Sequence, residues 1–290
     1  MGVFFFGMGY SSLASARAIH QGIDPAIPIS GTVRSEDRAE ELADSNYRMH
    51  VFDGSGPGAT LAPDLLSATR LVLSIPPDER GDPALNQHRD TIRQARRLGW
   101  ICYYSTVGVY GDFGGAWIDE AAPTRPINRR SQWRVEVEEQ WRQFAAELDV
   151  PLLILRLAGI YGPGRSAFDK LRDGTARRIV KPGQVFNRIH VEDIGRVTML
   201  AARQNLAGTF NLADDEPAPP QDLVAYAANK LGLAPPPEIP FETAEMTPMA
   251  RSFYSDNKRV LNQAIKAALG ISLLHPTYRD GLDAVLRHTA

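Results

Sequence analysis

The sequence predicts an α/β fold in which helices cover both faces of a doubly wound parallel sheet. Apolar runs alternate with helical patterns through the first two thirds of the 290 residues, and this alternation favours parallel strands joined by helical crossovers. At the N-terminus, one such run leads directly into a glycine turn and the start of a helix. In sheets of this kind, ligands bind beyond the carboxyl ends of the strands.

The first strand, turn and helix have the arrangement that binds a dinucleotide. The strand leads into Gly7, which tolerates a sharp turn, and Gly9, which leaves the backbone open to a pyrophosphate. The helix then offers free N–H groups and its positive dipole end to the phosphates. Ser12 replaces the third glycine of the motif, and its hydroxyl can reach a phosphate. The expected cofactor-binding loop is Gly7, Met8, Gly9, Tyr10, Ser11 and Ser12.

The other elements of this region follow in a regular order. The expected strands are Val3–Phe6, Ile27–Val33, Tyr47–Phe52, Arg70–Ser74, Trp100–Ser105 and Leu152–Leu157. The expected helices are Leu13–Gln21, Arg38–Asp44, Pro83–Leu98 and Gln132–Leu148.

The last third is less regular and is predicted to form a small substrate-binding cap. Basic, loop-like sequence follows Gly164, and two proline clusters frame a helix at Leu223–Leu231. Short strands are expected at Phe186–Val191 and Gly208–Ala213. The predicted dinucleotide-binding domain is 1–163, with 186–215 returning to it, and the cap is 164–185 and 216–290.

Composition excludes several classes of protein. The net charge of -2 argues against a nucleic-acid-binding surface, and no apolar stretch is long enough to span a membrane. The single cysteine, Cys102, cannot form an internal disulfide and fits a reducing cytoplasm. The six histidines show no metal-ligand spacing, so no metal site is expected.

Four segments carry motifs whose order extends over nearly the whole chain. The segments are Tyr104–Asp112, Leu155–Gly164, Ile189–Ile194 and Phe210–Asp214. In the first, Ser105-Thr106 precedes a Val-Tyr-Gly sequence, and the second contains Tyr-Gly-Pro-Gly. Together they resemble the extended short-chain dehydrogenase/reductases, which include nucleotide-sugar epimerases and dehydratases. The resemblance implies a Rossmann-type domain, a nicotinamide cofactor and a substrate-binding cap.

One departure from that family concerns its catalytic pair. The family has Tyr-x-x-x-Lys on the helix after the fifth strand, followed by a glutamate. Placing Glu138 on that glutamate puts Arg134 at the lysine and Arg130 at the tyrosine. A guanidinium only donates hydrogen bonds, so Arg130 cannot act as the general acid, whereas Arg134 can bind ribose hydroxyls and favour an oxyanion. This departure resembles the atypical, YeeZ-like members.

The resemblance implies roles for further residues near the reacting centre. Thr106 falls where the family's catalytic Ser or Thr sits, with Ser105 as a weaker candidate; the alternative is a strand-end hydroxyl that bonds local backbone. Tyr110 and Tyr161 are the nearest tyrosines, and either is a candidate for the missing acid, although such aromatics mostly pack around the cofactor.

Residues at the strand ends are expected to select and hold the cofactor. Arg34, with help from Arg38, favours the 2′-phosphate of NADP over the ribose of NAD. The alternative is a solvated loop arginine, which the nearby acids Glu36 and Asp37 favour. Asp53 stands where the family bonds the adenine, but an aspartate before glycine also forms turns. The rest of the expected cofactor site comprises Ser74, Ile75, Pro76 and Ala158. Seven basic residues between Arg165 and Arg188 favour an anionic ligand or form a solvated face.

Two functions follow from these features. The first is an oxidoreductase or epimerase/dehydratase-like enzyme that prefers NADP, with NAD possible, and acts on an anionic or sugar-like carbonyl compound. The alternative is a non-catalytic sensor of the cofactor, which Arg130 at the tyrosine position favours. The expected partner is a small-molecule substrate. The oligomeric state is open, and the resemblance implies that a homodimer would pair through the helices near Pro83–Leu98 and Gln132–Leu148.

Overall fold

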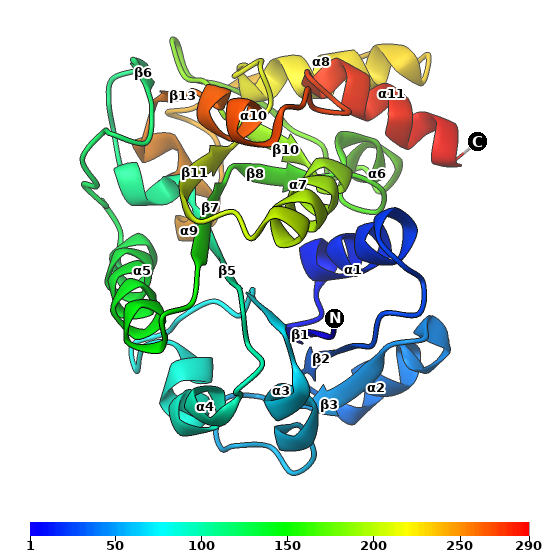
Figure 1. The fold of residues 1–290 in the computed structure, drawn as a ribbon. Helices are drawn as coiled ribbons and strands as arrows, with labels where there is room; N and C mark the ends of the chain where they lie inside the picture. The colour runs from blue at the N-terminus through cyan, green and yellow to red at the C-terminus, as the bar shows by residue number, and fades with distance from the viewer. Residues whose placement is uncertain (290) are drawn as a thin grey trace. The chain divides into compact units, whose positions relative to one another are not determined.

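A seven-stranded parallel sheet lies at the centre of the Rossmann-type part of the chain, as the sequence predicts. The computed structural model describes residues 1–289 (Figure 1). The strand order is β11-β7-β5-β4-β1-β2-β3. The winding direction reverses between β1 and β4, and ligands of doubly wound sheets bind at this switch point. The strands are β1 (Val3–Phe6), β2 (Ile29–Val33), β3 (Arg48–Val51), β4 (Arg70–Leu73), β5 (Ile101–Thr106), β7 (Leu152–Leu157) and β11 (Gly208–Leu212).

Helices cover both faces of this sheet. Figure 1 shows α3, α4 and α5 on one face and α1 and α7 on the other. The helices and one short 3-10 turn of this region are α1 (Tyr10–Gly22), α2 (Glu36–Glu41), η1 (Ala43–Ser45), α3 (Ala62–Ser67), α4 (Pro83–Gln94), α5 (Arg129–Leu148) and α7 (Val191–Gln204). Within the described residues, no helix has both the length and the apolar character needed to cross a membrane.

The face covered by α3, α4 and α5 holds a continuous apolar core. Phe4 and Phe6 of β1 alternate with residues that point to the other face, as strand geometry requires. Trp141 and Phe144 of α5 pack into the same core, three residues apart and therefore on one helix face. Burying each of these aromatic side chains contributes about 1.5–3 kcal/mol, which fixes α5 beside β5.

The opposite face joins β5 to α1 and α7 by hydrogen bonds rather than by apolar contact alone. The Tyr104 hydroxyl lies 2.7 Å from Ser15 Oγ of α1 and 2.7 Å from Thr198 Oγ1 of α7. Gly195 lets the two helices approach closely, because a Cβ atom there would lie 2.7 Å from the Ala14 carbonyl oxygen.

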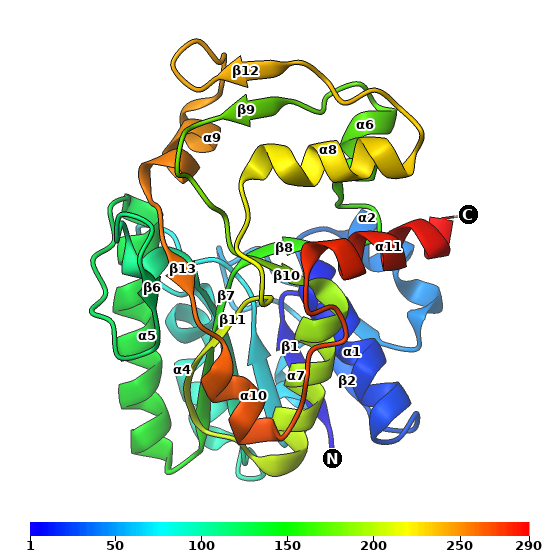
Figure 2. The same ribbon diagram turned by 90° about the horizontal axis from the view of Figure 1, so that it is seen from above.

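Residue contacts divide the chain into two compact units. The first comprises 1–106, 129–156 and 194–210; the second comprises 107–128, 157–193 and 211–290. In the second unit, β9 and β12 pair in parallel, as Figure 2 shows, and so do β8 and β10. Its elements are η2 (Val107–Tyr110), β6 (Trp117–Ile118), β8 (Gly159–Tyr161), α6 (Ala167–Arg172), β9 (Arg178–Val180), β10 (Arg188–His190), α8 (Pro220–Lys230), β12 (Glu238–Pro240), α9 (Pro248–Ser252), η3 (Phe253–Ser255), β13 (Arg259–Val260), α10 (Gln263–Leu269) and α11 (Tyr278–Thr289).

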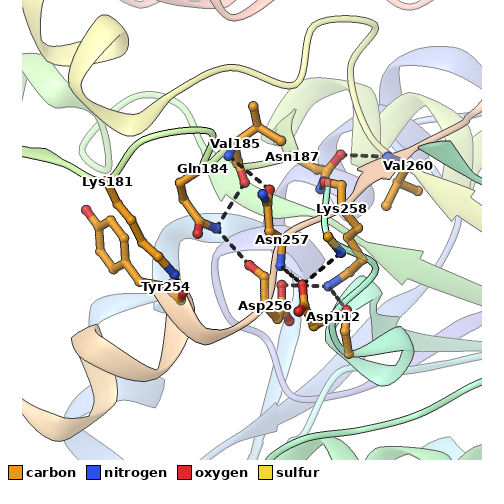
Figure 3. A network of polar contacts seen from close by, with 12 residues as sticks. Asp112, Lys181, Gln184, Val185, Asn187, Tyr254, Asp256, Asn257, Lys258 and Val260 are labelled. Carbon is orange, nitrogen blue, oxygen red and sulfur yellow. Dashed lines mark hydrogen bonds and ion pairs between the residues drawn. The ribbon is translucent and has the colours of Figure 1, made fainter. Parts of the chain in front are cut away.

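A buried lysine fastens distant segments of the second unit to one another. Lys258 is 2% exposed, and its ammonium group lies 2.7 Å from Asp256 Oδ1 and donates to the Gly111 carbonyl at 3.0 Å (Figure 3). The neighbouring Asn257 N–H donates to Asp112 Oδ1 at 2.8 Å. A buried ammonium group needs such partners, because losing water without replacement costs several kcal/mol.

Candidate functional site

The glycine turn between β1 and α1 leaves the start of the helix open. Gly7 has φ +95°, and a Cβ atom there would lie 2.8 Å from Ser74 Oγ. Gly9 is the N-terminal cap of α1 in an extended conformation, and a Cβ atom there would meet no atom within 4 Å. Gly7 is therefore required for the fold of the turn, whereas Gly9 leaves space above the first turn of the helix. That open space fits the pyrophosphate of a dinucleotide.

Two buried side chains of the expected pyrophosphate loop face the sheet and hold the loop in place. Met8 is buried against Gly31 of β2, where a Cβ atom would lie 2.4 Å from Met8 Cγ. Ser12 is also buried, and its hydroxyl donates to Ser74 Oγ at 2.9 Å, which in turn donates to the Gly7 carbonyl at 2.7 Å. The Ser12 hydroxyl thus joins α1 to the end of β4. A contact between this hydroxyl and a phosphate would compete with its hydrogen bond to Ser74.

The loop after β2 presents an arginine without an internal partner. Arg34 is exposed, and within residues 1–289 its guanidinium has no hydrogen-bond or ion-pair partner. Ser35 caps α2 by accepting the Arg38 N–H, and the Arg38 guanidinium is paired with Glu41. Of the two arginines expected to select NADP, Arg34 is the one whose guanidinium is available.

Asp53 forms a turn, which is one of the two roles that the sequence suggests for it; the other is a contact with the adenine. Its Oδ1 accepts from the Ser55 N–H at 2.8 Å and from the Ser55 hydroxyl at 2.7 Å. These hydrogen bonds hold the pKa of Asp53 below its usual value, so the exposed carboxylate is charged at neutral pH. The adenine contact expected of Asp53 stays a prediction, as do the cofactor contacts of Ile75 and Pro76.

A buried carboxylate organises the end of β5. Glu138 of α5 is 1% exposed and accepts the Ser105 hydroxyl at 2.5 Å. It also accepts Arg156 of β7 through both carboxylate oxygens, at 3.1 and 2.8 Å, and Arg142 at 3.0 Å. We call Ser105, Glu138, Arg142 and Arg156 the Glu138 cluster. Since Ser105 is committed to Glu138, its neighbour Thr106, which is half-buried at the strand end, is the more accessible hydroxyl.

Arg134 lies on α5 one turn before Glu138 and reaches back to the same strand. Its guanidinium donates to the Tyr104 carbonyl and lies 5.7 Å from the centre of the Tyr103 ring. Arg130, one further turn toward the helix start, is exposed. The two arginines share one side of the helix, as their four-residue spacing predicts. The structure thus ties Arg134 to the end of β5, and its correspondence to the family's lysine stays a prediction.

The two candidate tyrosines belong to the second unit, where their hydroxyls have partners. Tyr110 is fully buried and donates to Asn211 Oδ1 at 2.7 Å. Tyr161 is 5% exposed, and its hydroxyl donates to the Thr277 carbonyl at 3.4 Å. Burial raises the pKa of Tyr161, which disfavours release of its proton. Their catalytic role, like the cofactor role of Ala158, stays a prediction.

Several of the basic residues between Arg165 and Arg188 are used inside the second unit. Arg177 and Lys181 donate to the carbonyls of Glu245 and Tyr254. Arg188 is 6% exposed and donates to the Phe186 and Ala218 carbonyls. These three cations hold backbone segments together. Fewer of the seven basic residues therefore remain for a solvated face or for binding an anionic ligand.

A cavity of about 580 Å³ lies away from all of these residues. Its lining includes Gly2, Pro28, Tyr47, Arg48 and Asp64, which stand at or near the amino ends of β1, β2 and β3. Ligands of doubly wound sheets bind at the carboxyl ends instead. We therefore place the candidate site at the glycine turn and not at this cavity.

Replacing Arg34 tests whether it selects the cofactor. We expect Arg34→Ala to weaken NADP binding about ten- to hundredfold and to leave NAD binding nearly unchanged, since a charge-assisted phosphate contact is worth about 1.5–3 kcal/mol. Calorimetric titration with both dinucleotides measures this. Arg48→Ala, at the amino end of β3, is the matched control. Equal losses for NADP and NAD would show that Arg34 does not contact the 2′-phosphate.

Comparison with known sequences finds relatives of two kinds. No protein-family model matches the chain. The 3-diazoavenalumate denitrifying reductase of a Streptomyces species is 26% identical over 281 residues, 88% of this chain and 90% of that protein. Protein YeeZ of Escherichia coli K12 is 31% identical over 182 residues, which are 59% of this chain and 62% of YeeZ.

Solved structures support the same fold. A functionally unknown conserved protein from Silicibacter pomeroyi is 45% identical, with a TM-score of 0.88 over 99% of this chain and 98% of that one. UDP-glucuronic acid 4-epimerase from Bacillus cereus, solved in complex with NAD, is 16% identical, with a TM-score of 0.76 over 99% of this chain and 96% of that one. At this identity, the epimerase shows the fold alone. The structural neighbours thus have the epimerase/dehydratase fold, and the sequence relatives are a reductase and YeeZ.

Proposed function

We propose that this chain, an atypical member of the extended short-chain dehydrogenase/reductase superfamily, is an oxidoreductase or epimerase/dehydratase-like enzyme that uses a nicotinamide dinucleotide, with NADP preferred. Its proposed substrate is a carbonyl compound that is sugar-like or anionic. The observation that carries the proposal is the open position of Gly9 over the start of α1, at the switch point between β1 and β4. The reductase among the relatives and the NAD-bound structural neighbours support the cofactor class.

The residues present fit the cofactor at each of its charged parts. The pyrophosphate is assigned to the N–H groups in the first turn of α1, where the helix dipole favours negative charge. The 2′-phosphate is assigned to Arg34, the exposed and unpaired cation after β2. When bound, the nicotinamide supplies the hydride chemistry.

Thr106 and Arg134 are the groups of this chain assigned to the reacting carbonyl oxygen. Both stand at the carboxyl end of β5, one on the strand and one tied to it through the Tyr104 carbonyl. A guanidinium is always charged and donates several hydrogen bonds, so Arg134 stabilises negative charge on oxygen without giving up its own proton. The proton is therefore assigned to another donor, for which Tyr110, Tyr161, water and the substrate are the candidates.

Turnover by three proteins tests the enzymatic proposal. The parent, Arg134→Ala and Arg130→Tyr/Arg134→Lys are assayed with NADPH and NADH on a panel of sugar nucleotides and small carbonyl compounds. We expect Arg134→Ala to lower kcat about 10²–10³-fold, as loss of an oxyanion donor does. The double variant should gain no activity, because the site is built around two guanidinium groups. Arg97→Ala, an exposed arginine before β5, should match the parent.

The same assay decides between the enzyme and its alternative, a sensor that binds the cofactor without reaction. Arg130 at the tyrosine position favours the sensor, because it removes the family's proton donor. If the parent binds the dinucleotide tightly but neither oxidises nor reduces any member of the panel, the sensor replaces the enzyme as the proposed function.

A further inference from the structure

Two histidines and a glutamate converge in the second unit, and none of the three is assigned to the proposed cofactor or substrate. His190 ends β10, Glu192 lies in the first turn of α7, and His275 lies in the loop before α11. One ligand atom from each lies within 4.8 Å of the others. His275 Nε2 is 2.8 Å from Glu192 Oε2, and His190 Nδ1 is 3.8 Å from the same oxygen.

The surrounding fold holds these side chains in place. The buried Asp193 carboxylate accepts the N–H groups of Leu274 and His275, at 2.6 and 3.0 Å, and so fixes the loop that carries His275. The Tyr161 ring packs edge-on against His190, with ring centres 5.2 Å apart. The His190 and His275 rings themselves lie 4.0 Å apart. Buried contacts therefore fix the two histidines, whereas the Glu192 side chain is 39% exposed.

The hydrogen bonds inside the group leave His190 incompletely satisfied. His190 is 1% exposed, and its Nδ1 accepts the Glu192 backbone N–H at 3.3 Å. Its Nε2 is buried and has no hydrogen-bond partner within residues 1–289. A buried polar atom without a partner is costly, and in native proteins such an atom is usually satisfied by a bound water or ion or serves a function.

The ligand types suit a transition-metal ion. Imidazole nitrogens and carboxylate oxygens are the groups with which proteins hold such ions, and the fold brings three of them together here.

We infer that His190, Glu192 and His275 bind a divalent transition-metal cation of the zinc class. Two imidazoles and one carboxylate are a common ligand set for Zn²⁺, with a fourth position left to water or another side chain. The metal joins the end of β10 and the start of α7 to the loop before α11. Its role in this unit is structural, and the inference does not rest on the proposed cofactor or substrate.

Metal binding by untagged full-length protein tests this inference. After treatment with a chelator, the parent is titrated with Zn²⁺ by calorimetry, and Co²⁺ serves as a spectroscopic probe of imidazole ligation. We expect saturable binding of one metal ion and a rise in melting temperature with Zn²⁺. Glu192→Gln and His275→Asn should each weaken Zn²⁺ binding at least about tenfold. Glu192→Gln retains an amide oxygen that accepts the His275 hydrogen bond, so it is the variant expected to fold most normally.

His20→Asn is the matched control for His275→Asn. His20 lies on α1 in the other unit, where its Nε2 contacts the Ile27 carbonyl, and its loss should leave Zn²⁺ affinity unchanged. The inference is overturned if the parent shows no saturable binding of one Zn²⁺. It is equally overturned if Glu192→Gln and His275→Asn bind Zn²⁺ and change the Co²⁺ spectrum as the parent does.

Discussion

Replacing Glu138 with glutamine is expected to cost about 3–5 kcal/mol in the free energy of unfolding, because it leaves a buried arginine without its counter-charge. Glu138 is 1% exposed and Arg156 is 5% exposed. The two form a paired contact through both oxygens of the carboxylate. Glutamine keeps the size of the side chain but turns one acceptor into a donor that faces the guanidinium. The Arg156 charge then stays buried with one acceptor fewer, which is the costly outcome.

Urea unfolding followed by circular dichroism measures this effect. Glu136→Gln, an exposed position on the same helix, is the control and should change the free energy of unfolding by less than about 0.5 kcal/mol. Removing both charges with Glu138→Leu/Arg156→Met should recover part of the loss, since an apolar pair avoids the desolvation of two ions. A loss below about 1 kcal/mol in Glu138→Gln would contradict the role given to the charge.

Replacing Glu138 is also expected to affect function, because Glu138 holds the Ser105 hydroxyl. The Glu138 cluster fixes the Ser105 hydroxyl, and Ser105 is directly followed by Thr106, the hydroxyl assigned to the substrate. We therefore expect even a folded Glu138 variant to position Thr106 less well, because the strand end loses its anchor to α5.

Much of the fold could be predicted from local sequence. The bounds of β1 and β7 are those expected from their apolar runs, and α4 begins at the expected proline. The six-residue α3 was not predicted, because it is too short to show helical periodicity. The strand expected at Phe186–Val191 is β10, which ends at His190, and the residues after it begin α7, a helix that was not predicted. The family motif there describes a junction between a strand and a helix.

The candidate site was predictable where it depends on neighbouring residues and not where it depends on distant ones. The glycine turn is contiguous, so Gly7 and Gly9 could be assigned directly. In the sequence, Glu138 was used only to align Arg134 with the family's lysine. Its contact with Ser105 could not be predicted, because the two residues are 33 positions apart. The contact between Glu192 and His275 joins residues 83 apart, and no spacing pattern points to it.

Replacing Gly9 with valine is expected to abolish dinucleotide binding while leaving the fold intact. Gly9 has φ -88° and ψ -165°, an extended conformation that β-branched residues adopt readily. A Cβ atom there meets nothing within 4 Å, so the new side chain occupies the space assigned to the pyrophosphate. Gly7 cannot serve this test, because its φ of +95° and the nearby Ser74 Oγ would strain any side chain.

We expect Gly9→Val to weaken both NADP and NAD at least about a hundredfold, equivalent to about 2.7 kcal/mol, because both dinucleotides share the pyrophosphate. The free energy of unfolding should fall by no more than about 1 kcal/mol, the difference between glycine and valine at a helix cap. Gly2→Val is the control at the opposite end of β1, where a Cβ atom has only ordinary contacts at 3.9 Å. It should bind both dinucleotides as the parent does. If Gly9→Val binds them with the parent's affinity while Gly2→Val also behaves normally, the dinucleotide site lies elsewhere, and the assignments of Arg34, Thr106 and Arg134 around it lose their basis.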